Sequence, residues 1–168
     1  GYTHCCIEDI SIIRAIPNIA ILSPADCTET VKAVEASLNY KQSVYIRLTG
    51  SQNNPIVYKN DYKYEIGKFI ELKSGSDITI FSTGTMVYES LEAEKILQAQ
   101  GISSTVIDAH TIKPIDESAI IKLSKKSKLF VSIEEHSVVG GLGSAIAEVN
   151  STISSSPEHL IIGIPDKY

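Results

Sequence analysis

Strand-like and helix-like runs alternate along almost the whole chain, and this alternation constrains the fold more than any other feature of the sequence. Two β-rich runs, residues 19–22 and 43–48, flank a segment with helical spacing of apolar residues. A strand, a helix and a strand with short joints form a βαβ unit, which is normally parallel and right-handed. The sequence therefore predicts the α/β class.

The helix of this first unit has a recognisable start. Asp26 can accept a hydrogen bond at the N-cap, and Glu29 supplies the carboxylate three residues later. We expect a helix over residues 28–39, followed by a buried strand over residues 43–48. The helical period places three apolar residues on one face: Val31, Val34 and Leu38.

A polar stretch divides the chain. Residues 51–64 are rich in Asn and Tyr, have no apolar period, and are predicted to be a linker. Beyond them, residues 65–168 are predicted to form a three-layer α/β/α domain with a mostly parallel sheet. Its expected elements are strands 68–72 and 77–82 around a Ser-Gly-Ser-Asp turn, helix 86–99, a strand at 104–111, a helix after Pro114, strand 128–136, a glycine loop with a helix, and a last strand from 159.

Charge and composition exclude several classes of partner. A net charge of −5 gives no attraction to nucleic acid or to anionic lipid, and no apolar run has the ~18 residues of a membrane span. The 3 cysteines do not make a disulfide framework, so we expect a reduced, cytoplasmic protein. Because the chain of 168 residues begins with Gly1, we also expect it to be a processed or excised piece.

Two residues are candidates for substrate contacts. His4 lies in a loop before a helical stretch, where functional residues collect. Arg47 ends a predicted strand, at the edge where open α/β sheets bind ligands, and its guanidinium could bind a phosphate or carboxylate. The alternative for Arg47 is a structural ion pair with Glu8 or Asp9.

Three further motifs favour structural interpretations. The "GGLGSA" run at 140–145 lacks the G-x-G-x-x-G spacing, so a tight turn with close helix–sheet packing is favoured over a phosphate site. Glu134, Glu135 and His136 alternate in direction along a strand, which favours polar contacts at a domain interface over a metal site. Adjacent His4, Cys5 and Cys6 lack zinc spacing, and both cysteines are expected to be half-buried.

A family resemblance extends these inferences. The run "GYTHCCIEDISIIRAIPNIAILSPAD" resembles the stretch of transketolases that contains a T-H motif, a Glu, an Arg, "PN" and "PAD", and "VYIRL" resembles the strand that follows. The runs "IGKFIELKSGSDITIFSTGTMVYESLEAEKIL", "VIDAHTIKPID" and "VSIEEHSVVGGLGSAIAEV" resemble the carboxy-terminal domain of these enzymes. The resemblance covers the chain in order and is greatest to transketolases divided into two subunits.

The resemblance implies a function for the complete enzyme: thiamine diphosphate- and Mg²⁺-dependent transfer of a two-carbon ketol unit between sugar phosphates. It implies that residues 1–50 end the pyrimidine-binding domain and that residues 65–168 are the carboxy-terminal domain. The implied partners are an amino-terminal transketolase subunit or domain, in a homodimer or heterotetramer. His4 would hydrogen-bond substrate hydroxyls and polarise the developing alkoxide, and Arg47 would bind the sugar phosphate.

The same resemblance limits what this chain can do alone. The family's cofactor-activating glutamate and its diphosphate and metal motif match no part of the sequence, so we expect no cofactor or metal on the chain alone and no activity. We also expect exposed apolar surface where the first region is incomplete. The alternatives are a β subunit of a 2-oxo-acid dehydrogenase, a deoxyxylulose-phosphate synthase, and a non-catalytic interaction or regulatory module.

Overall fold

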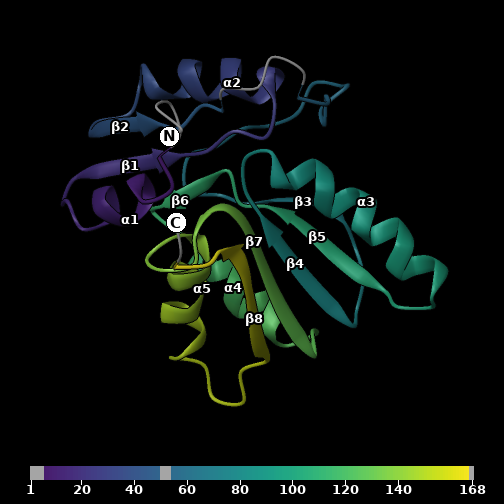
Figure 1. Ribbon diagram of the computed structural model, residues 1–168. Coiled ribbons are helices and arrows are strands. Elements are labelled where there is room, and N and C mark those ends of the chain that lie inside the picture. The colour runs from purple at the N-terminus through teal and green to yellow at the C-terminus, as the bar shows by residue number, and fades with distance from the viewer. Residues whose placement is uncertain (1–5, 50–53, 167–168) are drawn as a thin grey trace.

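The computed structural model describes residues 6–49 and 54–166, which form two sheets and five helices (Figure 1). The smaller sheet has the order β2-β1-β6 and the larger has the order β3-β5-β4-β7-β8. The helices are α1 (Asp9–Arg14), α2 (Cys27–Ser37), α3 (Met86–Ala99), α4 (Glu117–Ser124) and α5 (Leu142–Asn150). The strands are β1 (Ile19–Leu22), β2 (Ser43–Ile46), β3 (Ile70–Lys73), β4 (Ile78–Ser82), β5 (Ser104–Asp108), β6 (Thr111–Lys113), β7 (Leu129–Ser137) and β8 (Glu158–Ile164).

The smaller sheet contains the predicted βαβ unit. β1 and β2 pair in parallel, with Ile19 opposite Ser43, and α2 connects them. The third strand, β6, was not expected as a separate element, and it pairs antiparallel with β1. The later part of the chain therefore completes the sheet that the first part begins. One apolar core joins the two, because Ile21 of β1 belongs to the same buried cluster as Phe81 of β4.

The start of α2 is as predicted, but its orientation and the burial of β2 are not. Asp26 accepts the backbone N–H of Glu29 at 2.8 Å, so the N-cap is confirmed. The helix buries Glu29 and Ala33 and leaves its apolar face exposed. The exposed fractions on that face are 58% for Val31, 45% for Val34 and 79% for Leu38. The prediction of a buried second strand was wrong, because β2 is an edge strand with β1 on one side only.

The larger sheet confirms the mostly parallel α/β class. β5, β4, β7 and β8 run parallel, and only β3 is antiparallel. The strands predicted on either side of the Ser-Gly-Ser-Asp turn are both present, but they are not neighbours. β4 lies between β5 and β7, so β3 instead pairs with β5 at the edge of the sheet.

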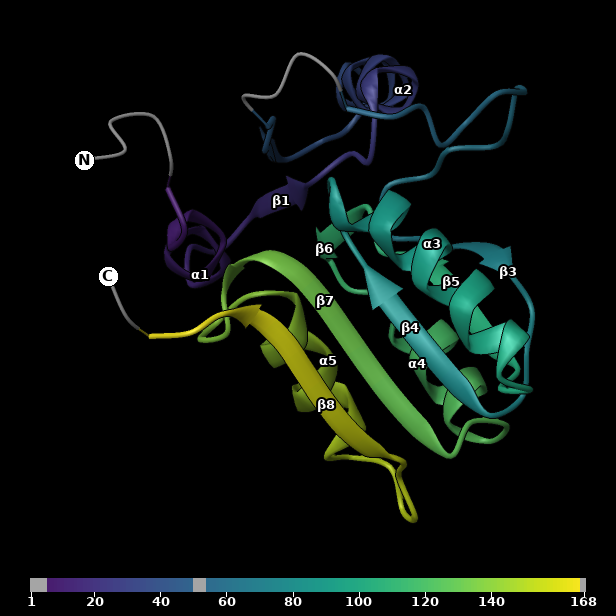
Figure 2. The ribbon, with the colours of Figure 1, turned by 45° about the vertical axis from the view of Figure 1, so that its right-hand side comes forward.

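Helices cover both faces of the larger sheet, which gives the expected three layers (Figure 2). Alternate residues of β4 point to opposite layers. Ile80 belongs to the apolar cluster that includes Leu91 of α3. Phe81 packs edge-on against Phe130 in the cluster that includes α4 and α5.

Two further features bear on the predicted boundaries. α3 spans the predicted residues 86–99, and Gly101 follows it with a φ of +80°, a backbone conformation suited to glycine. Residues 54–69 contain no helix or strand, yet Tyr58 packs against Ala25 and Val87, and its ring stacks on that of Tyr62 at 3.8 Å. Within the described ranges, no helix has the length and apolarity needed to cross a membrane.

Candidate functional site

Arg47 lies where the sequence placed it, directly after the carboxyl end of β2. Its backbone N–H donates to the carbonyl of Leu22 at 2.8 Å, which fixes this point of the chain beside the end of β1. Only 14% of its side chain is exposed. The guanidinium is therefore held within the protein at the sheet edge rather than extended into solvent.

Three protein groups bind this guanidinium. Nε of Arg47 contacts both oxygens of Asp9, at 2.9 and 3.2 Å, which confirms the predicted alternative of an ion pair. Nη2 donates to two main-chain carbonyls, those of Cys6 at 3.1 Å and Glu135 at 3.0 Å. Of the five N–H groups of an arginine, the two on Nη1 have no acceptor among residues 6–49 and 54–166. The end of the fork remains available for a ligand.

Asp9, on α1, is at the centre of this arrangement. The hydroxyl of Tyr45 donates to its Oδ2 at 2.8 Å, and Nε2 of His136 lies 3.9 Å from its Oδ1. Burial and the neighbouring Asp9 carboxylate raise the pKa of Tyr45 to about 12, so the phenol stays a neutral donor near neutral pH. Asp9 thus joins α1 to the end of β2.

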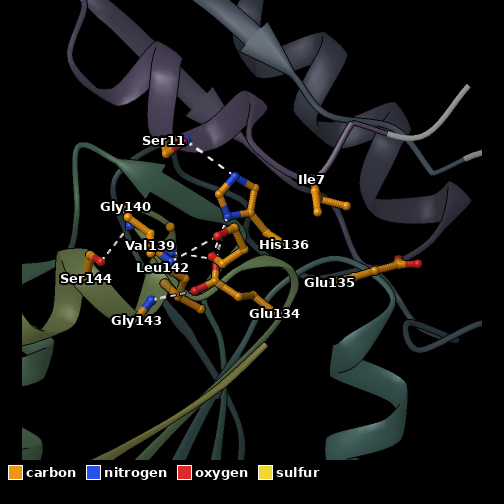
Figure 3. Close-up of polar contacts among 12 residues, drawn as sticks. Ile7, Ser11, Glu134, Glu135, His136, Val139, Gly140, Leu142, Gly143 and Ser144 are labelled. Carbon is orange, nitrogen blue, oxygen red and sulfur yellow. Dashed lines mark hydrogen bonds and ion pairs between the residues drawn. The ribbon is translucent and has the colours of Figure 1, made fainter. Parts of the chain in front are cut away.

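His136, on β7, connects the larger sheet to α1 (Figure 3). Its Nδ1 lies 2.8 Å from the carbonyl of Ser137, and the backbone N–H of Ser11 lies 3.4 Å from its Nε2. Because a carbonyl only accepts, Nδ1 is assigned the proton and Nε2 is assigned as the acceptor. A second bond, from Ser137 N–H to the carbonyl of Ile7 at 2.8 Å, runs between the same segments.

Glu134 occupies the N-terminus of α5. Its carboxylate accepts the backbone N–H groups of Leu142 at 2.7 Å and Gly143 at 2.8 Å. Burial raises the pKa of Glu134, and the two backbone donors act in the opposite direction. A Cβ at Gly141 would overlap this carboxylate. The predicted tight turn with close packing is confirmed, and these helix donors are satisfied by the chain itself rather than by a phosphate.

The alternation predicted for the Glu134–His136 segment is also present. Glu135 is exposed and accepts a hydrogen bond from the hydroxyl of Thr85 at 2.8 Å, on the side opposite to its two neighbours (Figure 3). Glu134 and His136 are both buried and make polar contacts to α5 and α1. No set of three metal-ligating side chains suited to an ion occurs in the described part of the chain.

Some predicted positions fall outside the description, and one needs correction. His4 and Cys5 lie outside the described residues. Cys6 is exposed, so the expectation of a half-buried thiol was wrong for this residue. Thiamine diphosphate does not fit the described residues: they offer its Mg²⁺ no ligand set, and the one glycine-rich helix N-terminus among them already binds Glu134.

Sequence reasoning missed a second cluster, which is internal. Glu29 of α2 and Asp108 of β5 are both fully buried, and their carboxyl groups contact each other. Tyr58 donates its hydroxyl to Asp108 at 2.5 Å, and the backbone N–H of Ala25 donates to Glu29 at 2.7 Å. Burial raises the pKa of Asp108 to about 7 and that of Glu29 well above its ordinary value. Only the cap pattern at Asp26 hinted at this cluster.

Comparison with known proteins gives one family and several relatives. The family model "Transketolase, C-terminal domain" matches residues 67–160. One of the two subunits of an apulose-4-phosphate transketolase from Phocaeicola vulgatus is 38% identical over 169 residues, which are 99% of this chain and 53% of that protein. A 1-deoxy-D-xylulose-5-phosphate synthase from Caldanaerobacter subterraneus subsp. tengcongensis is 38% identical over 168 residues, which are 100% of this chain and 27% of that protein.

Among solved structures, a split-gene transketolase in an inactive β4 tetramer superimposes with a TM-score of 0.93 at 39% identity. The superposition covers 99% of this chain and 55% of that chain. The chain therefore spans about half the length of the split-type relatives that it matches.

Proposed function

Because the chain belongs to the transketolase family, we propose that it is the carboxy-terminal part of a split transketolase that transfers a two-carbon ketol unit between sugar phosphates. In this proposal residues 1–50 end the pyrimidine-binding domain, residues 51–64 link, and residues 65–168 form the carboxy-terminal domain. The partner is an amino-terminal subunit, and the assembly is a homodimer or a heterotetramer. Thiamine diphosphate and Mg²⁺ bind to the complete enzyme, and none of the described residues is assigned to them.

Arg47 is assigned to the phosphate of the substrate. The observation that carries this role is a guanidinium fixed by Asp9 and two carbonyls, with both N–H groups of Nη1 left without an acceptor among the described residues. A fixed guanidinium fork with free donors matches the geometry of a phosphate group. The position at the carboxyl end of β2 agrees with the usual ligand edge of an open α/β sheet.

His4 is assigned to the sugar hydroxyls near the reacting carbons. This role comes from the match of the Thr3–His4 pair to the family's T-H motif. An imidazole can donate or accept a hydrogen bond near neutral pH, which suits contact with a hydroxyl whose charge changes during reaction. His4 and Arg47 would then bind opposite ends of one sugar phosphate.

A deoxyxylulose-phosphate synthase is the second candidate. It is favoured by one observation, the 38% identity to such a synthase over the whole chain, equal to the identity with the transketolase from Phocaeicola vulgatus. Both enzymes act on phosphorylated sugars or their precursors, so Arg47 would keep its role. The substrates that donate the two-carbon unit separate the two proposals.

The test uses the full-length protein mixed with its amino-terminal partner, thiamine diphosphate and Mg²⁺. Ketol transfer between two pentose phosphates is the expected result, followed by chromatography of the products. Consumption of pyruvate with no reaction of pentose phosphates would overturn the transketolase proposal. A synthase product from pyruvate would favour the second candidate, and oxidative decarboxylation would favour a dehydrogenase.

A further inference from the structure

We propose that Asp9 is a positioning residue, which holds the Arg47 guanidinium in its phosphate-binding orientation and connects it to the carboxy-terminal region. The inference rests on the proposed function, because Arg47 must bind substrate for its orientation to matter. Asp9 itself acts only through Arg47. The carboxy-terminal region would then contribute to substrate binding without touching the substrate.

The contacts of Asp9 are more specific than a surface ion pair requires. Both of its oxygens contact Nε of Arg47, and Oδ2 also accepts the hydroxyl of Tyr45. The side chain of Asp9 is only 10% exposed, so solvent screens the pair weakly. Because Nε is occupied, the plane of the guanidinium is fixed, and Nη1 keeps one direction.

The carboxy-terminal region fixes the same guanidinium from the other side. The carbonyl of Glu135, on β7, accepts from Nη2 of Arg47. The next residue, His136, accepts from the backbone of α1 at Ser11, two residues after Asp9. The end of β7 therefore sets the position of both partners of the ion pair (Figure 3).

The expected consequence of losing Asp9 follows from this geometry. Without the carboxylate, Nε loses its acceptor and a mostly buried guanidinium loses its counter-charge. The side chain would then sample several orientations, and a shifted Nη1 would bind phosphate poorly. A displaced binding group weakens binding of the phosphorylated end but leaves the reacting atoms of a substrate without phosphate unaffected.

The test is steady-state kinetics of Asp9→Asn in the complete enzyme assembled with its amino-terminal partner. The amide keeps the size of the side chain and one accepting oxygen but removes the charge. We expect the KM for a phosphorylated acceptor to rise about ten-fold with kcat nearly unchanged. The KM for the same sugar without phosphate should change less than about two-fold. Asp61→Asn is the matched control, because Asp61 is 92% exposed and pairs with Lys32 on the far surface of α2.

A double-mutant cycle separates positioning from a general structural effect. In an Arg47→Ala background, Asp9→Asn should leave the KM of the phosphorylated sugar unchanged. Tyr45→Phe, which removes a second contact of Asp9, should raise that KM by a smaller factor. Equal KM values for wild type and Asp9→Asn in an active enzyme would overturn the inference while the proposed function stands. Failure of the wild-type enzyme to transfer a ketol unit would instead overturn the proposed function.

Discussion

The carboxylate of Glu134 accepts the backbone N–H of Leu142 at 2.7 Å, so the first turn of α5 is capped by an anion from β7. Free N–H groups and the helix dipole at this end favour negative charge. The neighbouring Gly141 allows the approach, since any side chain there would overlap the carboxylate. The glycine run thus packs a helix against a strand.

Replacing Glu134 by Gln should lower the free energy of unfolding by about 2–4 kcal/mol. The amide leaves one oxygen to accept a backbone N–H, but its NH₂ group faces the other donor and removes the charge. Urea denaturation followed by circular dichroism measures the loss. Glu135→Gln is the control, because that side chain is exposed and keeps its contact with Thr85. Equal midpoints for the two variants would contradict the capping role.

The buried pair of Glu29 and Asp108 predicts a pH dependence of stability. Both pKa values are raised on folding, that of Asp108 from a normal value of about 3.9 to about 7. The folded state therefore binds more protons than the unfolded state in this interval. The contribution of the pair to stability is complete below about pH 4 and is lost as the pH rises through 7. The slope is at most about 1.4 kcal/mol per pH unit for each group.

A variant isolates this term from other titrating groups. His110, whose pKa is lowered by burial to about 4, changes stability in the opposite direction between pH 4 and 6.5. We therefore predict the difference between Glu29→Gln and wild type: the variant gains stability relative to wild type as the pH rises from about 5 to about 8. Denaturation curves across this range measure it, with Glu35→Gln on the exposed side of α2 as control. A constant difference would show that the pair shares no proton.

Tyr58 should contribute to stability through its hydroxyl. Tyr58→Phe removes the donor to Asp108 and leaves a fully buried carboxyl oxygen without its partner. We expect a loss of about 1–3 kcal/mol in the free energy of unfolding. Tyr40→Phe is the control, since the Tyr40 hydroxyl has no hydrogen bond within the described ranges. Comparable losses in both variants would assign the effect to the ring edge and not to the bond.

The 168-residue chain by itself should not bind thiamine diphosphate. The described residues supply no metal ligand set, and the donors at the start of α5 are satisfied by Glu134. Titration calorimetry with the cofactor and Mg²⁺ should give no saturable heat. Addition of the amino-terminal partner to the full-length protein provides the positive control. One-to-one, magnesium-dependent binding to the isolated chain would refute this prediction.

Local patterns in the sequence determined the elements of this protein. Apolar period and capping residues located α2 and α3, because a helix depends on neighbours within one or two turns. Strand alternation correctly separated Glu135 from its buried neighbours. The charged residue that ends β2 marked Arg47 as a candidate. The family resemblance supplied the roles proposed for His4 and Arg47, which composition and spacing alone left open.

Only the tertiary structure decided which elements pair and what each polar side chain contacts. β6 joins β1 from a distant part of the chain, and β3 pairs with β5 instead of β4, because strand pairing depends on the whole sheet. α2 buries Glu29 because Asp108, far away in sequence, and the backbone of Ala25 provide its partners. Asp9 could be named as one of two partners for Arg47, but its selection required the approach of α1, β2 and β7. Long-range contacts of this kind leave no periodic trace in the sequence.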